Sequence, residues 1–387
     1  MPPRVTHVIT RLIRGGAQLT LYNLVKGLKA RGTVCEVVSG PEAGSEGSIL
    51  DEVKALGVPV TLLPSLGREA NPLWDAAALL ALARHFAASR PEIVHTHTSK
   101  AGLLGALGAR LAGVPSVVYT AQGHIFAERG AVPSVTDRPR RRALFMALRR
   151  LAEARSDRIV ALTPADLEEQ VALGLAPREK YAVIPNGVDP APFERLSSRA
   201  EARRSLGLPA DAALVITVGR LSPEKSQDIL LEALAAIGDR TVQAILVGDG
   251  PTRAALEARA NQPDLSGRVH FLGLRTDVPL CLAAADLYVL PSRYEAQGMV
   301  VVEAMMAGLP IIASRVGGVP GIIAHGVTGI LEPPESPDRL SRSIVSLVLD
   351  PERGNTLGQK ARQYALADLG TDAMVDRYLA LYRELGA

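Results

Sequence analysis

Cysteine and aromatic residues are scarce in this 387-residue sequence. The only cysteines are Cys35 and Cys281, and aromatic residues make up 4% of the chain. The two cysteines lie far apart in sequence and in different predicted domains, which argues against a disulfide framework and against a cysteine-based metal site. A reducing compartment, the cytoplasm, is therefore the expected location.

Long apolar segments and targeting signals are also absent from the sequence. The most apolar stretch, residues 101–115, is interrupted by Arg110 and by glycines, and no window approaches about 18 uninterrupted apolar residues. Residues 1–16 lack the apolar centre of a secretory signal peptide. We expect a cytoplasmic protein that does not span a membrane.

Charge is moderate and balanced. The net charge is +3 and charged residues make up 21% of the chain, which argues against disorder and against a protein that coats polyanions. The few aromatics and the lack of a recognition motif give no support for nucleic-acid binding. Hydrophobic residues make up 47%, rich in alanine, leucine and valine, as in α/β proteins with buried parallel strands.

Strand and helix patterns alternate along the whole chain. Strands are predicted in the first half at residues 5–10, 35–40, 58–64, 91–98, 116–123, 158–163 and 181–187, with helices such as 75–89 and 140–154 between them. A segment with two prolines and a glycine, residues 186–193, resembles a linker, and a second series starts with the strand 213–220. This pattern predicts an α/β protein with two doubly wound, Rossmann-like domains, residues 1–188 and 189–367. Residues 368–387 predict a docking helix with Met374, Tyr378, Leu379 and Tyr382 on one face.

The chain is organised around residues 291–318. A short strand, 286–290, leads into a polar loop with Glu295, and Gly298 then precedes the compact run 299–307. The three valines of that run favour a strand, but its later residues form helices well, and Gly308 with Pro310 is a helix stop signal. We predict a buried helix.

A loop followed by a helix N-terminus suits an anion, and two carboxylates accompany it here. Glu295 lies in the loop and Glu303 inside the helix. A buried carboxylate needs hydrogen-bond donors, which a ribose diol or sugar hydroxyls would supply. The alternative is a Glu303 that caps or pairs inside the core and a Glu295 that is a solvated loop charge. The two residues together favour the functional interpretation.

This stretch resembles the signature of the retaining family 4 glycosyltransferases, which have the two-domain GT-B fold. The matching positions are Pro291, Ser292, Glu295, Gly298, Glu303, Ala304, Gly308, Pro310, Gly317 and Gly318. The resemblance implies that the two domains face each other across a cleft and that the last helix crosses back to the first domain. It also implies that Glu295 approaches the donor sugar, that Glu303 holds the ribose, and that Gly298, Met299 and Val300 form the nucleotide-sugar site. Ala296-Gln297 departs from the Gly-Phe that is commoner in the family, which bears on the sugar preference.

A pair of cations follows the first strand of the second domain. Arg220, after Gly219, and Lys225 suit a diphosphate, since arginine binds it bidentately and lysine adds a mobile charge. They could also be ordinary surface charges. In the resembled family this motif neutralises the leaving nucleoside diphosphate, so Arg220 and Lys225 are expected to be catalytic.

The same resemblance assigns further residues to binding of the nucleotide-sugar donor. Gly248 lies in a tight turn on the nucleotide side of the cleft, Leu274 and Arg275 lie beside the base, and Gly15 and Gly16 lie near the donor phosphates. The glycine pair is not part of a G-x-G-x-x-G fingerprint, so a dinucleotide-dependent oxidoreductase is rejected.

Two histidines alternate on the strand 91–98 and therefore share a face. His95 and His97 could suggest a metal, but with no carboxylate or further histidine expected nearby we predict none. The phrase 94–105 resembles the capsule and exopolysaccharide branch of the family, which implies that His97 and His124 lie on the acceptor side. Gln122 stands where that branch has a histidine, and we expect it to act by hydrogen bonding.

The helix 140–154 is strongly basic. Its arginines, with those just before and after it, flank Leu144, Phe145, Leu148 and Leu151. Such a helix can lie on an anionic membrane surface, or it can be a crossover helix whose leucines pack on the sheet and whose arginines are solvated.

We predict a metal- and cofactor-independent, retaining glycosyltransferase. It would move a hexose or N-acetylhexosamine from a nucleoside diphosphate sugar, expected to be a UDP-sugar, to a hydroxyl on a glycan or lipid-linked acceptor. The rival functions are a nucleotide-sugar epimerase of the same fold and a non-catalytic sugar-nucleotide-binding protein.

Overall fold

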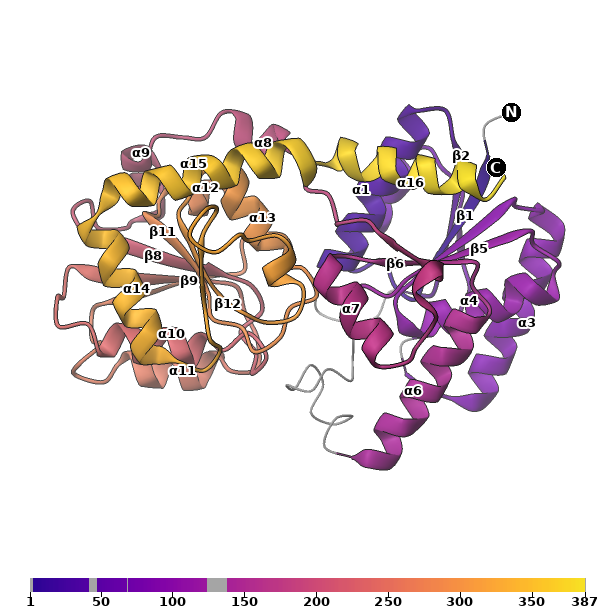
Figure 1. Cartoon of the computed structure of the whole chain (residues 1–387), viewed down its shortest axis with the longest axis horizontal. Helices are drawn as coiled ribbons and strands as arrows, with labels where there is room; N and C mark the ends of the chain where they lie inside the picture. Colours follow the sequence, from indigo (N-terminus) through magenta and orange to yellow (C-terminus); the bar gives the residue numbers. More distant parts are fainter. Residues whose placement is uncertain (1–2, 42–46, 68, 124–137, 387) are drawn as a thin grey trace. The chain divides into compact units, whose positions relative to one another are not determined.

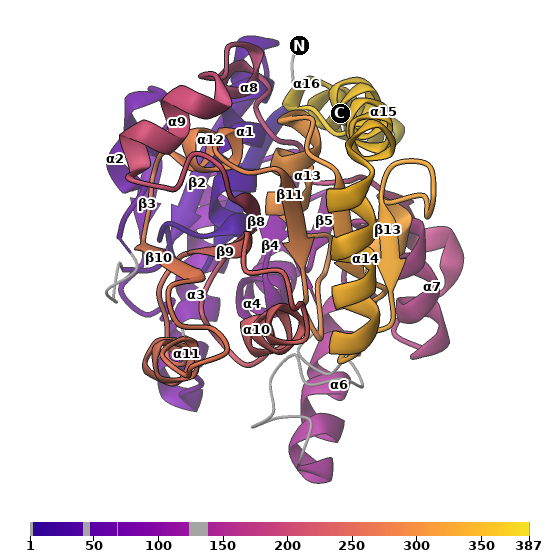
Figure 2. The same ribbon diagram turned by 90° about the vertical axis from the view of Figure 1, so that its left-hand side faces the viewer.

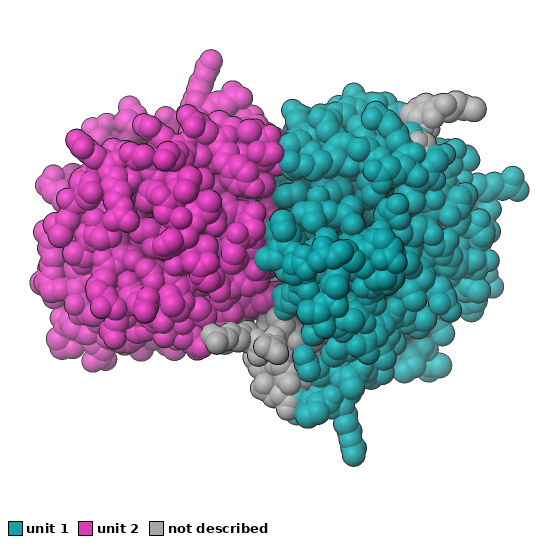
Figure 3. Space-filling view, viewed as in Figure 1, with its two compact units in different colours: residues 1–126, 132–187, 371–387 teal, residues 127–131, 188–370 magenta. Residues whose placement is uncertain are grey.

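The computed structural model describes residues 3–41, 47–67, 69–123 and 138–386. It divides into two compact units (Figures 1 and 3). Among the described residues, the first unit runs to Gly187 and resumes at Thr371, while the second comprises Val188–Gly370.

The first unit contains a seven-stranded parallel sheet with the order β3-β2-β1-β4-β5-β6-β7. Its strands are β1 (Arg4–Ile9), β2 (Val34–Ser39), β3 (Val60–Leu62), β4 (Ile93–His97), β5 (Ser116–Thr120), β6 (Arg158–Ala161) and β7 (Tyr181–Val183). Its helices are α1 (Gly16–Ala30), α2 (Leu50–Ala55), α3 (Pro72–Ser89), α4 (Ser99–Leu111), α6 (Pro139–Ala154), α7 (Pro164–Ala172) and α16 (Thr371–Glu384).

Helices cover both faces of this sheet. Val118 of β5 packs in a core with residues of α1 and α16, whereas its neighbour Val117 packs with α3 and α4 on the opposite face. Alternate residues of a strand point to opposite faces, so β5 buries apolar side chains on both sides of the sheet. The buried side chains Met374, Tyr378 and Tyr382 dock α16 on the first unit, as the amphipathic pattern and the resemblance predicted.

The second unit repeats the plan with six parallel strands in the order β10-β9-β8-β11-β12-β13. Its strands are β8 (Ala213–Val218), β9 (Val242–Val247), β10 (Val269–Gly273), β11 (Leu287–Leu290), β12 (Ile311–Ser314) and β13 (Ile330–Glu332). Its helices are α8 (Ala191–Glu194), α9 (Arg199–Leu206), α10 (Gln227–Ala235), α11 (Arg253–Ala260), α12 (Val278–Ala283), α13 (Met299–Met306), α14 (Pro337–Leu349) and α15 (Pro351–Asp368).

Two cores flank the second sheet. One joins the sheet to α10, α11 and α14, and the other joins it to α9, α12, α13 and α15 (Figure 2). Along the sheet, Tyr288 of β11 lies opposite Ile216 of β8 and Ile311 of β12. In sequence the chain runs outward from β8 to β10 and returns to β11 beside β8. The β8–β11 boundary is therefore the topological switch point, where doubly wound sheets bind ligands at the carboxyl ends of their strands.

Local signals account for where two important helices begin and end. The valine-rich run 299–307 forms α13, which ends before Gly308, a residue with a φ of +77°, so the prediction of a helix is confirmed. Helix α3 begins three residues before the predicted 75, because the side chain of Asn71 accepts hydrogen bonds from the N–H groups of Leu73 and Trp74. Pro72 then occupies the first helical position, where its missing N–H costs nothing.

Candidate active site

Two loops meet at the switch point of the second unit. The loop after β8 contains Arg220 and Lys225, and the loop after β11 contains Glu295. The backbone N–H of Arg293 donates to the carbonyl of Glu224 at 2.8 Å, which joins the two loops directly. Residues from two parts of the sequence are thereby held at one point.

Lys225 and Glu295 form an ion pair at this junction. The Lys225 ammonium lies 2.5 Å from Glu295 Oε1, and the hydroxyl of Ser292 donates to the same oxygen at 3.0 Å. Glu295 is buried, and the Lys225 side chain is 30% exposed. The carboxylate that the resemblance places near the donor sugar is therefore compensated by the cation expected to contact the leaving diphosphate.

Glycine is required at two turns around this junction. A Cβ on Gly317, which has a φ of +46°, would lie 2.0 Å from the carbonyl oxygen of Glu295, and Gly318 donates its N–H to that same oxygen at 3.0 Å. A Cβ on Gly248, after β9, would lie 2.0 Å from the carbonyl oxygen of Gly219, after β8. Only glycine permits such approaches of one backbone to another.

Helix α13 begins at the same edge. Gly298 is its N-cap in a left-handed conformation, and Met299 and Val300 form its first turn, whose N–H groups lack helical acceptors. Glu303 lies one turn further on. Burial raises the pKa of Glu303 to about 7, and its Oε2 has no hydrogen-bond partner among the described residues. A buried carboxylate with an unpaired oxygen is stabilised when a bound ligand donates a hydrogen bond to that oxygen.

Tyr288 lies close to both carboxylates. Its hydroxyl is buried, and burial together with the charges of Glu295 and Glu303 raises its pKa well above the ordinary range. Tyr288 is therefore a neutral phenol under all ordinary conditions. Nothing in the sequence pointed to this residue beyond its place in an apolar strand.

The remaining positions assigned to the donor in the second unit are more exposed. Arg220 is exposed, and its carbonyl accepts a hydrogen bond from the side chain of Gln227 at 3.0 Å, which fixes the loop. The Leu274 side chain is largely exposed, and Arg275 makes a bidentate ion pair with Asp277 at 2.8 and 2.5 Å. The side chain of Arg275 is thus occupied within its own loop.

In the first unit, Gly15 is the N-cap of α1 and Gly16 its first residue, and neither has a positive φ. Gln122, just after β5, does have a positive φ, of 62°. The Asn186 side chain donates to Gln122 Oε1 at 2.9 Å. Sequence reasoning missed Asn186, since it is 64 residues away from Gln122 and looked like part of the linker. His124 lies outside the described residues.

The expectation that no further histidine lies near His95 and His97 is wrong. His7 of β1 is brought beside them, because β1 is the neighbour of β4 in the sheet. His7 Nδ1 lies 3.1 Å from His97 Nε2, and all three side chains are fully buried. His97 is consequently an interior residue of the unit, although the resemblance assigned it to the acceptor side.

His95 belongs to a hydrogen-bond network that reaches α16, and the His7–His97 pair packs against the ring of His95, with 4.1 Å between the ring centroids of His95 and His97. His95 contacts the hydroxyl of Tyr382 at 2.7 Å and that of Thr120 at 2.9 Å, and Thr120 also contacts Tyr378 at 3.2 Å. Nitrogen atoms of the three rings lie within 4.8 Å of one another. However, His7 and His97 face each other in a hydrogen bond and both nitrogens of His95 are engaged. We therefore interpret the cluster as a neutral network that docks α16.

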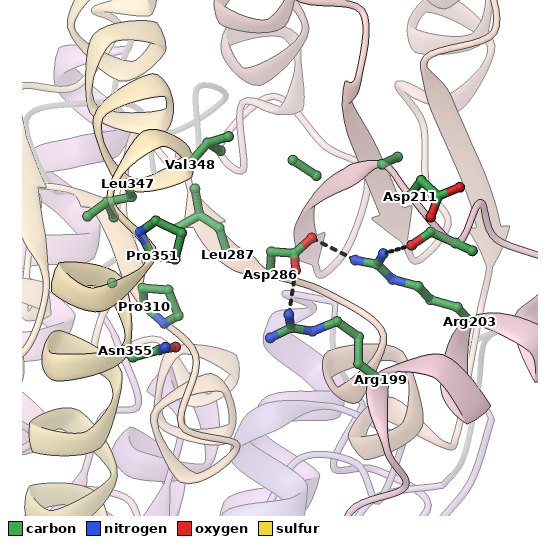
Figure 4. Close-up of a pocket in the computed structure, with 14 residues that line it drawn as sticks. Arg199, Arg203, Asp211, Asp286, Leu287, Pro310, Leu347, Val348, Pro351 and Asn355 are labelled. Carbon is green, nitrogen blue, oxygen red and sulfur yellow. Dashed lines mark hydrogen bonds and ion pairs between the residues drawn. The ribbon is translucent and has the colours of Figure 1, made fainter.

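A cavity of about 310 Å³ lies elsewhere in the second unit (Figure 4). Ala213 and Leu287, the first residues of β8 and β11, line it, so it lies at the amino ends of the strands. Its two arginines are paired with Asp286, Arg199 at 2.8 Å and Arg203 at 2.6 Å. This cavity is at the opposite edge of the sheet from the candidate site.

Two doubly wound units with these loop residues define the GT-B class of glycosyltransferases. Residues 15–187 match the family model described as a glycosyl transferase 4-like domain, and residues 198–364 match that of glycosyl transferases group 1. The chain belongs to the family 4 glycosyltransferases, as its signature predicted.

Individual relatives support this assignment. A D-inositol 3-phosphate glycosyltransferase of Catenulispora acidiphila is 34% identical over 76% of this chain and 72% of its own. The Escherichia coli UDP-Gal:alpha-D-GlcNAc-diphosphoundecaprenol alpha-1,3-galactosyltransferase is 29% identical over 89% of this chain and 87% of its own. Among solved structures, Anabaena HepE in complex with UDP and glucose has a TM-score of 0.81 and 25% identity, covering 99% of this chain and 100% of that one.

Within the described ranges, no helix is long and apolar enough to cross a membrane.

Proposed function

We propose that this glycosyltransferase moves a hexose or N-acetylhexosamine from a UDP-sugar to a hydroxyl of a lipid-linked sugar or glycan, with retention of the anomeric configuration. The observation that carries the proposal is the contact between Lys225 and Glu295, beside the exposed Arg220 and the N-terminus of α13. Two cations and a helix N-terminus therefore lie at the carboxyl edge of the sheet, at its switch point.

The chemistry assigned to these residues is stabilisation of the leaving group. Negative charge grows on the diphosphate as the glycosyl–oxygen bond breaks, and Arg220, Lys225 and the N–H groups of Met299 and Val300 would take it up. A preorganised donor at a developing anion contributes on the order of 3 kcal/mol. These groups provide positive charge without a metal ion, so we propose metal-independent transfer, to be tested by assaying activity in a chelator.

The donor is assigned from two kinds of support. HepE was crystallised with UDP and glucose, and the E. coli relative is named for UDP-galactose. In this chain, the unpartnered Oε2 of Glu303 suits the donor hydroxyls of a ribose. On the family resemblance alone, we also assign Gln122, whose side chain is held by Asn186, to the donor sugar.

The acceptor is assigned from the relative that uses a diphosphoundecaprenol-linked sugar and from the basic helix α6. Arg138, Arg140 and Arg141, at its start, are exposed, and the only acid of α6, Glu153, is buried against Arg149. An exposed basic helix end next to exposed leucine is suited to the surface of an anionic membrane, where a lipid-linked acceptor resides.

The decisive experiment incubates the protein with UDP-, GDP- and ADP-sugars and follows thermal stability, because a ligand that binds the folded state raises the unfolding temperature. The stabilising donor is then offered to lipid-linked and soluble hydroxyl acceptors, and the anomeric configuration of the product is determined by NMR. An inverted product would disprove retention.

The two rivals predict different products. An epimerase would convert the nucleotide sugar and release an altered sugar without any acceptor. A non-catalytic binding protein would be stabilised by the donor but would neither hydrolyse nor transfer it. Transfer that depends on an added acceptor excludes both.

A further inference from the structure

Helix α3 carries an apolar surface that its own unit does not cover. Of its 18 residues only Ala78, Leu82 and Phe86 are fully buried, and they face α4, where Leu82 and Phe86 approach Gly108. These three recur every fourth residue, which is the spacing of one helix face. Nine of the 18 residues are exposed, so half of the helix faces away from the core.

The opposite face of α3 is apolar as well. Leu73 is 83% exposed and Leu80 is 54% exposed, and with Ala77, Arg84 and Ala87, also exposed, they follow the i, i+4, i+7 spacing of a single stripe. Trp74 lies beside this stripe and is 54% exposed. We call Leu73, Trp74, Ala77, Leu80 and Ala87 the α3 stripe.

Charge hardly interrupts the stripe. Asp75 pairs with Lys100 at 2.5 Å and His85 pairs with Glu36 at 2.8 Å, so both are engaged within the unit. Arg84 is the one charged residue aligned with the stripe, and its charge is positive. A helix that is apolar on both faces is normally covered on both, so the exposed face of α3 indicates a partner.

The start of α3 and the basic start of α6 lie at the same edge of the sheet. Helices that connect parallel strands begin at the carboxyl ends of the strands they follow, and α3, α4 and α6 follow β3, β4 and β5. The Lys100–Asp75 pair joins the first turns of α4 and α3, and α4 also packs on α6 (Figure 1). Leu144, near the start of α6, is 56% exposed.

We propose that the α3 stripe is an interfacial anchor. It inserts at the boundary between the headgroups and the acyl chains of an anionic bilayer, while the arginines of α6 contact the headgroups. Charge complementarity selects this occupant: exposed Arg84, Arg138, Arg140 and Arg141 accompany exposed leucines and a tryptophan. Tryptophan favours the boundary between headgroups and acyl chains, because it is apolar with one polar N–H. Stable attachment usually needs two signals, and here an apolar stripe and a basic helix end would provide them.

This inference rests on the proposed function only in taking a membrane as the place of the acceptor. Its test exploits the sequence, because Trp74 is the only tryptophan of the chain. Full-length protein is mixed with vesicles of phosphatidylglycerol and phosphatidylcholine, or of phosphatidylcholine alone. Sedimentation measures binding, while tryptophan emission and its quenching by acrylamide or by brominated acyl chains report on Trp74.

With anionic vesicles we expect a blue shift of the emission, weaker acrylamide quenching and strong quenching by brominated lipid. Leu73→Gln with Leu80→Gln should weaken partition at least tenfold without changing the unfolding temperature, since both side chains face solvent. The matched control is Leu349→Gln, at the end of α14 in the second unit, where leucine is 78% exposed. It should bind like the wild type.

Three results would overturn the proposal. The protein could sediment with vesicles while the emission of Trp74 stays unchanged, which would assign binding to α6 alone and leave the proposed function intact. The blue shift could follow protein concentration without vesicles, which would make a second copy the occupant. The leucine variants could bind vesicles as well as the wild type. Donor-induced stabilisation, measured in parallel without vesicles, tests the proposed function independently.

Discussion

Lys225 and Glu295 are 70 residues apart in sequence, yet their side chains meet at 2.5 Å across the switch point of the second sheet. The contact combines the cation expected at the leaving diphosphate with the carboxylate expected at the sugar. It also changes what mutation of the lysine should do. A lysine on an exposed wall could be removed with little effect on folding, but this one neutralises a buried carboxylate.

Arg220 and Lys225 should therefore respond differently to substitution. Arg220→Ala is expected to reduce kcat/KM by roughly 100-fold or more and leave the unfolding temperature nearly unchanged, because the side chain is exposed. Lys225→Ala should reduce activity similarly and also cost about 1–2 kcal/mol of stability, because Glu295 loses its partner.

The double variant Lys225→Ala with Glu295→Gln separates the two effects of the lysine. It should regain most of the stability and none of the activity. Lys360→Ala, an exposed lysine of α15, is the matched control. Kinetics and denaturant unfolding decide the outcome, and near-normal transfer by the Arg220→Ala, Lys225→Ala protein would show that the phosphate site is wrongly assigned.

Glu303 should make both stability and donor binding depend on pH. Burial raises the pKa of its carboxyl to about 7, so between the ordinary carboxyl range and pH 7 the folded state holds a proton that the unfolded state has lost. This contribution to stability is present at low pH and is lost as pH rises toward 7. Glu303→Gln should stabilise the free protein at pH 8 by about 1–3 kcal/mol.

Donor binding should show the opposite trend. If the ribose donates to the carboxylate, affinity for UDP rises with pH up to about 7 and is constant above it. Glu303→Gln then binds UDP more weakly than the wild type above pH 7, and the difference shrinks as the pH falls. Isothermal titration from pH 5.5 to 8.5 measures this. A UDP affinity independent of pH in the wild type would remove Glu303 from the ribose site.

The histidine network should make the first unit sensitive to acid. Burial lowers the pKa of His7 to about 3, and burial with the neighbouring rings lowers the pKa values of His95 and His97 well below the usual range. The unfolded chain then binds more protons below about pH 6.5, so this stability is complete above that pH and is lost as pH falls. His97→Gln should reduce the slope of unfolding free energy against pH between 6 and 4.5.

Tyr382→Phe tests the hydrogen bond between α16 and His95. It keeps the packing of α16 but removes the hydroxyl that contacts His95, at a cost of about 1–2 kcal/mol at pH 8. Urea unfolding monitored by circular dichroism measures both effects. An unchanged acid slope in His97→Gln would mean that the network is not neutral in the folded protein.

Gln122 should act by hydrogen bonding and not by proton transfer. Gln122→Ala is expected to lose much of kcat/KM, Gln122→His to be tolerated, and His124→Ala to have the smaller effect. Asn186→Asp tests the orientation of Gln122 more directly. A carboxylate cannot donate to Gln122 Oε1, so the side-chain amide of Gln122 would flip and present its NH2 group to the aspartate. In the Gln122→Ala background Asn186→Asp should add little, as a double-mutant cycle would reveal. A far larger loss at His124 than at Gln122 would transfer the role to His124.

The sequence by itself determined the alternation of strands and helices, the helix α13 and the glycine turns. These features depend on local chemistry, because each is determined by a few neighbouring residues. Examples are apolar runs of strand length, the helix stop signal of Gly308 and Pro310, and the backbone freedom of Gly317. The family signature at Glu295 and Glu303 is local in the same sense. The apolar face of α16 also followed from spacing alone.

Only the tertiary structure decided which distant groups meet. His7 joins His95 because β1 neighbours β4, Lys225 meets Glu295 because β8 neighbours β11, and Asn186 reaches Gln122 from beyond β7. Strand order is set by the packing of whole layers, so no short stretch of the sequence indicates which strands become neighbours. For α3 the composition misleads as well, because leucine and alanine on every side indicate a covered helix. The fold buries one face and leaves Leu73 and Leu80 in solvent.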